Sequence, residues 1–97
     1  VVIDEVTVPV AAEVRSACAL LGLDPMQVAN EGRLVAWVAG RDGERAVQVL
    51  RAGTGGEQAV AIGYVVDEHP GMVVGRTAIG GTRIIDVPLG ELLPRIC

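Results

Sequence analysis

The stretch "MVVGRTAIGGTRIIDV", residues 72–87, sets the architecture expected for this chain. Both of its halves are rich in β-branched residues, and Gly80-Gly81 lies between them, which is typical of two strands joined by a tight hairpin. A third apolar run, residues 59–66, precedes them and is set apart by the turn-forming sequence "DEHPG" at 67–71. The sequence therefore predicts a meander of three strands.

Before this meander, strand-like and helix-like patterns alternate. Residues 1–8 are expected to form a strand that ends at Pro9, because proline cannot continue a hydrogen-bonded ladder. Residues 11–22 place apolar side chains on one helix face, and Gly22 is a plausible helix stop.

Three further elements are expected in the middle of the chain. Residues 24–32 predict a short helix with Asp24 as its N-cap, and the apolar run 33–40 predicts a strand. Asp42 is expected to cap another helix, which Gly53 ends.

Helices that alternate with strands and then give way to a meander indicate an α/β fold, a two-layer sandwich in which helices cover one face of a mixed β-sheet. We expect one α/β domain over residues 1–87. Residues 88–97 contain two prolines and a glycine and are expected to form a flexible tail.

Composition narrows the classes of function. Eight basic and twelve acidic residues give a net charge of -4, which argues against a nucleic-acid surface. No apolar run approaches the ~20 residues that span a bilayer, and no secretion signal is recognisable. We expect a cytoplasmic location, and the absence of an initial Met suggests part of a longer protein.

Most candidate sites have an ordinary structural interpretation. The glycine-rich run at 53–58 lacks the Lys-Ser/Thr ending of a phosphate-binding loop, and the run at 75–81 lies between predicted strands rather than before a helix, so both are expected to be turns. His69, the only histidine, is expected to be a solvated turn residue, so no metal site is predicted. Cys18 falls in an apolar helical pattern and is expected to be an inert, buried thiol.

Two segments contain better candidates for functional residues. Asn30 and Glu31 lie between a predicted helix and a predicted strand, although the pattern alone favours a helix end with a solvated Glu31. Cys97 follows Arg95 in the final "PRIC", and in an extended chain both side chains project to the same side. A nearby cation favours the reactive thiolate. The residues by themselves leave open whether Cys97 is a mobile reactive thiol or an arbitrary chain end.

Three segments together carry a resemblance: "ACALLGLDPMQVANEGRLVAWV" at 17–38, "DEHPGMVVGRTAIGGTRIID" at 67–86, and the terminal "PRIC" at 94–97. They resemble the C-terminal domain of the HypE family of hydrogenase expression/formation proteins, in the PurM-like superfamily of aminoimidazole ribonucleotide synthetase. The likeness covers nearly the whole chain, and "PRIC" separates this family from the rest of the superfamily.

The resemblance implies a carbamoyl dehydratase that makes the cyanide ligands of [NiFe]-hydrogenase. It implies that HypF supplies a carbamoyl group to Cys97, that ATP with Mg²⁺ drives its dehydration to a thiocyanate, and that the HypC–HypD complex receives the cyanide. Glu31 becomes the candidate base, while Asn30 and Arg95 are weaker candidates for orienting the substrate. ATP and homodimer contacts are expected mainly from another, preceding domain.

Two alternatives remain at this stage. The chain could be a non-catalytic carrier and docking module recognised by the same partners. It could also be part of a different ATP-dependent synthetase or kinase of the superfamily.

Overall fold

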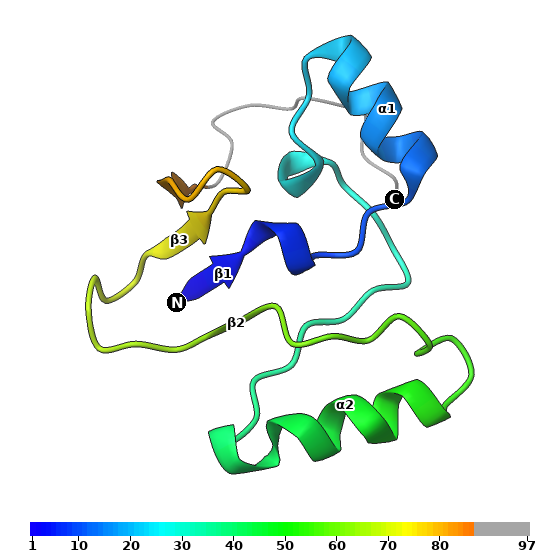
Figure 1. Ribbon diagram of the computed structural model, residues 1–97, viewed down its shortest axis with the longest axis vertical. Helices are drawn as coiled ribbons and strands as arrows, with labels where there is room; N and C mark the ends of the chain where they lie inside the picture. Colours follow the sequence, from blue (N-terminus) through cyan, green and yellow to red (C-terminus); the bar gives the residue numbers. More distant parts are fainter. Residues whose placement is uncertain (87–97) are drawn as a thin grey trace.

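A four-stranded mixed sheet lies at the centre of the computed structural model, which describes residues 1–86 (Figure 1). Its strands are β1 (Val2–Asp4), β2 (Gly63–Tyr64), β3 (Val73–Arg76) and β4 (Thr82–Ile85), in the spatial order β2-β1-β3-β4. β1 runs antiparallel to β2 and parallel to β3, and β3 runs antiparallel to β4. The expected α/β class with a mixed sheet is confirmed.

Two α-helices accompany the sheet, α1 (Ala12–Leu21) and α2 (Gly43–Ala52). Gly22 ends α1 as expected, because it adopts a left-handed conformation (φ 69°) and donates its N–H to the Cys18 carbonyl. Asp42 occupies the N-cap position of α2 without a capping hydrogen bond from its side chain, and Gly53 follows the last residue of that helix.

The first predicted strand is shorter than expected. Glu5–Thr7 form a 3₁₀ turn, η1, directly after β1, and the Thr7 hydroxyl donates to the Asp4 carbonyl at 2.7 Å. A further 3₁₀ turn, η3 (Gly40–Asp42), leads into α2. The chain therefore leaves the sheet after Asp4, four residues before the predicted end of the strand.

Four other expectations were wrong. The three last strands form no continuous meander, because β1 lies between β2 and β3 in the sheet. The predicted helix at 24–32 is only a 3₁₀ turn, η2 (Pro25–Gln27), because Val28 returns to extended geometry. Residues 33–39 form no strand, since none of the described strands pairs with them. The predicted two-residue hairpin is a longer connection over 77–81, in which the Thr77 N–H donates to the Gly81 carbonyl at 2.8 Å.

Cys18 is the only buried hydrophobic side chain among residues 1–86, at 5% exposure, and it carries a free thiol, as predicted. Many large apolar side chains are instead exposed, among them Leu34, Trp37, Val49 and Ile79. No helix in the described part of the chain is both long and apolar enough to cross a membrane. The predicted tail at 88–97 lies outside the described residues.

Candidate functional site

A polar cluster formed by Glu5, Asp24 and Arg83, here called the Arg83 cluster, joins three distant parts of the sequence. Arg83 lies on β4 directly opposite Gly75 of β3. Its Nε donates to Glu5 Oε2 at 2.9 Å, its Nη2 donates to the second oxygen of the same carboxylate, and its Nη1 donates to Asp24 Oδ2 at 2.5 Å. One guanidinium thus connects β4, η1 and the residue that caps η2.

Gly75 provides the space that this cluster needs. A Cβ atom added to Gly75 would overlap the Glu5 carboxylate and the side chain of Ile85. Glycine at this position therefore allows the Glu5 side chain to cross the sheet and reach Arg83. This close approach explains one glycine of the 75–81 run without invoking phosphate binding.

The charges in the cluster stabilise one another. The hydrogen bond from Arg83 is the main cause that lowers the pKa of Asp24; the Met26 N–H also lowers it, and partial burial acts in the opposite direction. The pKa of Arg83 is raised, first by its hydrogen bonds to Glu5 and then by Asp24. Glu5 is the most enclosed member, because only 15% of its side chain is exposed against 40% for Arg83.

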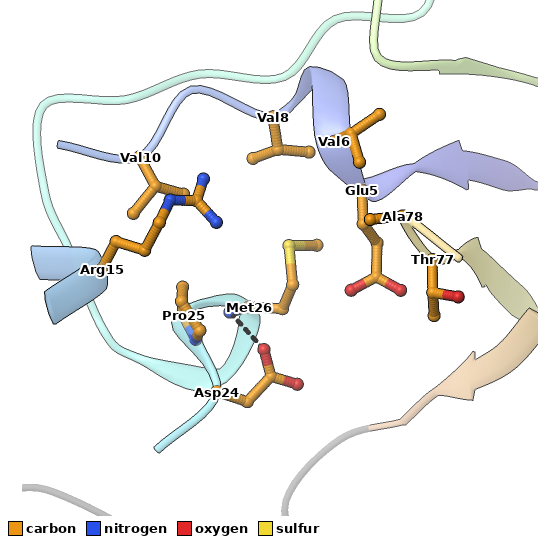
Figure 2. Close-up of a pocket in the computed structure, with 10 residues that line it drawn as sticks. All are labelled: Glu5, Val6, Val8, Val10, Arg15, Asp24, Pro25, Met26, Thr77 and Ala78. Carbon is orange, nitrogen blue, oxygen red and sulfur yellow. Dashed lines mark hydrogen bonds between the residues drawn. The ribbon is translucent and has the colours of Figure 1, made fainter. Parts of the chain in front are cut away.

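A small cavity of about 190 Å³ adjoins this cluster (Figure 2). The Arg15 guanidinium points toward it from α1, and the carboxylates of Glu5 and Asp24 lie across from Arg15. The rest of the lining is mostly apolar: Val6, Val8, Val10, Pro25, Met26, Thr77 and Ala78. Carboxylates on one side and a guanidinium on the other could orient a small polar group against the apolar wall.

The structure places the predicted site residues as follows. Asn30 and Glu31 are both exposed, on the loop that follows η2, and the Asn30 Nδ2 donates to the Val28 carbonyl at 3.4 Å. Neither residue lines the cavity. Arg95 and Cys97 lie outside the described residues, so their relation to Glu31 stays a prediction.

The ordinary interpretation of His69 is confirmed. It is exposed and occupies the turn between β2 and β3 with a left-handed φ of 51°.

The glycine-rich run at 53–58 is also a turn, as predicted. It follows the carboxyl end of α2, where carbonyl oxygens rather than N–H groups are free, so its position disfavours a phosphate. A Cβ atom on Gly56 would overlap the Leu50 carbonyl, which gives this glycine a packing role.

Neither ATP nor a metal has an evident site among residues 1–86. These residues contain no group of three or more His, Cys, Asp or Glu side chains that could hold a metal ion. The cavity beside the Arg83 cluster is bordered by the carboxylates of Glu5 and Asp24, which would repel a triphosphate, and Arg15 is the one cation among the described residues that line it. The described residues therefore do not fit an ATP–Mg²⁺ site by themselves.

Sequence reasoning missed the Arg83 cluster. No sequence pattern singles out Arg83, because its partners Asp24 and Glu5 lie 59 and 78 residues away in the chain. Asp24 was correctly expected to cap η2, and its Oδ1 does accept the Met26 N–H at 3.0 Å.

No family model matches the chain, but individual proteins do. It is 48% identical over 96 residues to a carbamoyl dehydratase HypE of Rhodobacter capsulatus and 39% identical over 95 residues to that of Escherichia coli K12. These alignments cover 99% and 98% of the chain. The chain spans 28% of the length of either relative.

Solved structures agree with this match. A crystal structure of hydrogenase maturation protein HypE superposes with a TM-score of 0.87 at 44% identity, covering 99% of this chain and 32% of that one. A second, of HypE in complex with ATP, gives a TM-score of 0.86 at 42% identity, with 99% and 30% covered.

The fold and the comparisons agree, since the chain is similar to proteins named HypE and hydrogenase expression/formation protein. Over its whole length the chain corresponds to one segment of the HypE proteins, and the resemblance expected from the sequence is confirmed.

Proposed function

We propose that this chain is the part of a HypE carbamoyl dehydratase that carries the reacting thiol, Cys97, together with a candidate base, Glu31. The observation that carries the proposal is the match to proteins named carbamoyl dehydratase HypE, which extends over 99% of the chain at 48% identity. A match of this extent supports a shared role for the segment.

The chemistry assigned to Cys97 follows from the properties of sulfur. The thiolate attacks the carbamoyl carbon, a C–S bond forms, and the donor's leaving group departs, which leaves an S-carboxamide. The carboxamide oxygen then accepts the γ-phosphoryl group of ATP while the nitrogen loses one proton. The oxygen departs as phosphate, the nitrogen loses its second proton, and an S-bound nitrile, a thiocyanate, remains.

Glu31 is proposed to take a proton from the carboxamide nitrogen, because a carboxylate on an exposed loop is accessible to a substrate carried on another segment. Asn30 is proposed to orient the carboxamide with its own amide group, and Arg95 to favour the Cys97 thiolate.

The nucleotide requirement is part of the proposal. A relative crystallised in complex with ATP supports ATP binding in the family. The described residues lack a site that fits ATP and Mg²⁺, so we propose that other parts of the full-length protein hold both. We further propose HypF as carbamoyl donor, HypC–HypD as cyanide acceptor, and a homodimer as the full-length assembly.

A second candidate function is a carrier and docking module without catalytic residues of its own. The position of Glu31 away from the cavity favours this alternative. The two functions differ in what Glu31 contributes, since a pure carrier needs only Cys97.

The test uses a chimaeric HypE in which this chain replaces the corresponding segment of the Rhodobacter capsulatus protein. With HypF, carbamoyl phosphate and Mg-ATP, mass spectrometry of the C-terminal peptide should show a carbamoyl adduct that then loses one water. Cys97→Ala should abolish both changes, and Glu31→Gln should permit the adduct but slow the loss of water. Normal dehydration in Glu31→Gln would favour the carrier function, and an unmodified Cys97 would refute both.

A further inference from the structure

We infer that Arg83 is a positioning residue, which fixes the loop bearing Asn30 and Glu31 relative to strand β4, the strand that precedes the Cys97 segment in sequence. The inference rests on the proposed function for its catalytic consequence. Its structural basis is a set of contacts that meet at the short turn η2.

The first contact holds the beginning of η2. Asp24 uses both carboxylate oxygens, because Oδ1 accepts the Met26 N–H at 3.0 Å and Oδ2 accepts from Arg83 Nη1 at 2.5 Å. The same side chain thus caps the turn and ties it to β4. Removal of the Arg83 bond would leave η2 capped but no longer bonded to β4 through Asp24.

The second contact holds the end of η2. The Gln27 Nε2 donates to the carbonyl of Asp86 at 3.1 Å, directly after β4. Both ends of the turn are therefore bonded to the same strand or its immediate continuation. Asn30 and Glu31 follow Gln27 by three and four residues, so the position of η2 largely sets where their loop begins.

The third contact fixes the direction of the guanidinium. Glu5 accepts from both Nε and Nη2, which leaves Nη1 directed at Asp24. A lysine has all its donors on one nitrogen, so it lacks the planar fork with which Arg83 bonds both oxygens of Glu5 and also reaches Asp24. Charge alone therefore should not replace Arg83.

The matched control is Arg76, which also lies on the sheet and whose guanidinium stacks over the Tyr64 ring, 5.8 Å from the ring centroid. Arg76 is not a member of the Arg83 cluster. Arg83→Lys and Arg76→Lys thus make the same chemical change at a site that holds η2 and at one that does not.

The experiment measures two steps in the chimaeric HypE. In single turnovers, Arg83→Lys should slow the loss of water from carbamoylated Cys97 about tenfold, because a shifted loop misplaces the base, while carbamoylation keeps its wild-type rate. Arg76→Lys should leave both rates unchanged. If Arg83 acts through Asp24, the double variant Arg83→Lys/Asp24→Asn should be no slower than the slower single variant.

A measurement independent of chemistry accompanies the kinetics. Hydrogen exchange of the hydrogen-bonded backbone amides at 26–28 should accelerate in Arg83→Lys but not in Arg76→Lys. Unchanged exchange at 26–28, or equal slowing of both chemical steps, would overturn the positioning role. A wild-type chimaera that never loses water would refute the proposed function instead, and the exchange data would still decide whether Arg83 positions the loop.

Discussion

The Arg83 cluster and the region formed by α2 with residues 33–38 differ in what holds them. Around Arg83, hydrogen bonds connect segments that are distant in sequence, and the Glu5 side chain is only 15% exposed. In the second region, Leu34 is 72% exposed and Trp37 is 68% exposed, although the sequence there is strongly apolar. Figure 1 shows α2 set apart from β3 and β4.

This difference separates two sources of order. Directional bonds to Arg83 fix three elements with little burial, whereas Leu34, Val35 and Trp37 are apolar and remain largely exposed. A contiguous exposed apolar surface commonly marks an interaction site. When the chain is studied alone, substitutions in the Arg83 cluster should therefore lower the free energy of unfolding more than substitutions in α2 or residues 33–38.

The largest effect is expected from Gly75→Ala. The new Cβ would overlap the Glu5 carboxylate and Ile85, so the cluster must separate or the strands must shift. We expect a loss of about 1–3 kcal/mol in the free energy of unfolding, measured by urea denaturation of the chain.

Its control is Gly43→Ala at the start of α2, where a Cβ meets no atom within 4 Å and the backbone is helical. That change should be neutral or stabilise by up to about 1 kcal/mol. Equal effects of the two substitutions would remove the distinction between the regions.

An intermediate effect is expected from Asp24→Asn, which removes the charge that pairs with Arg83 but keeps an amide oxygen that can accept the Met26 N–H. At neutral pH the free energy of unfolding should fall by about 1 kcal/mol, since a part-exposed ion pair contributes modestly.

The pH dependence of stability tests whether the charge of Asp24 causes this loss. Because folding lowers the pKa of Asp24, its charged form stabilises the folded state above the ordinary value of 3.8, and this contribution is lost as the pH falls through the lowered pKa. Urea denaturation at a series of pH values should show that the free energies of unfolding of the wild type and of Asp24→Asn become equal in acid. A difference that persists after Asp24 is protonated would show that its charge is not the cause.

The smallest effect is expected from Trp37→Gln. Its exposed side chain makes little packing contribution, so the free energy of unfolding of the chain should change by less than about 0.5 kcal/mol. A loss above about 2 kcal/mol would mean that the region is covered, and the comparison would then fail.

The sequence predicted those elements whose cause is local. Gly22 ends α1 and the turn around His69 forms, because helix stops and turns depend on a few adjacent residues. The mixed sheet also followed from the order of helical and extended patterns. The predicted strand at 33–40 failed because a strand needs a partner, and apolar composition does not supply one.

The candidate site was less accessible to prediction. Glu31 and Cys97 came from the resemblance and remain predictions. The Arg83 cluster has no local signature, since Glu5 and Arg83 are brought together only when β1, β3 and β4 align. Gly75 was the nearest available clue, although its run suggested only a turn.

The central claim is that Cys97 of this chain becomes a thiocyanate. Infrared spectroscopy of the chimaeric HypE, supplied with HypF, Mg-ATP and ¹³C-labelled carbamoyl phosphate, tests it most directly. A nitrile absorption should appear, shift with the isotope, and be missing in Cys97→Ala. Consumption of ATP and carbamoyl phosphate without any isotope-sensitive nitrile band would contradict the account.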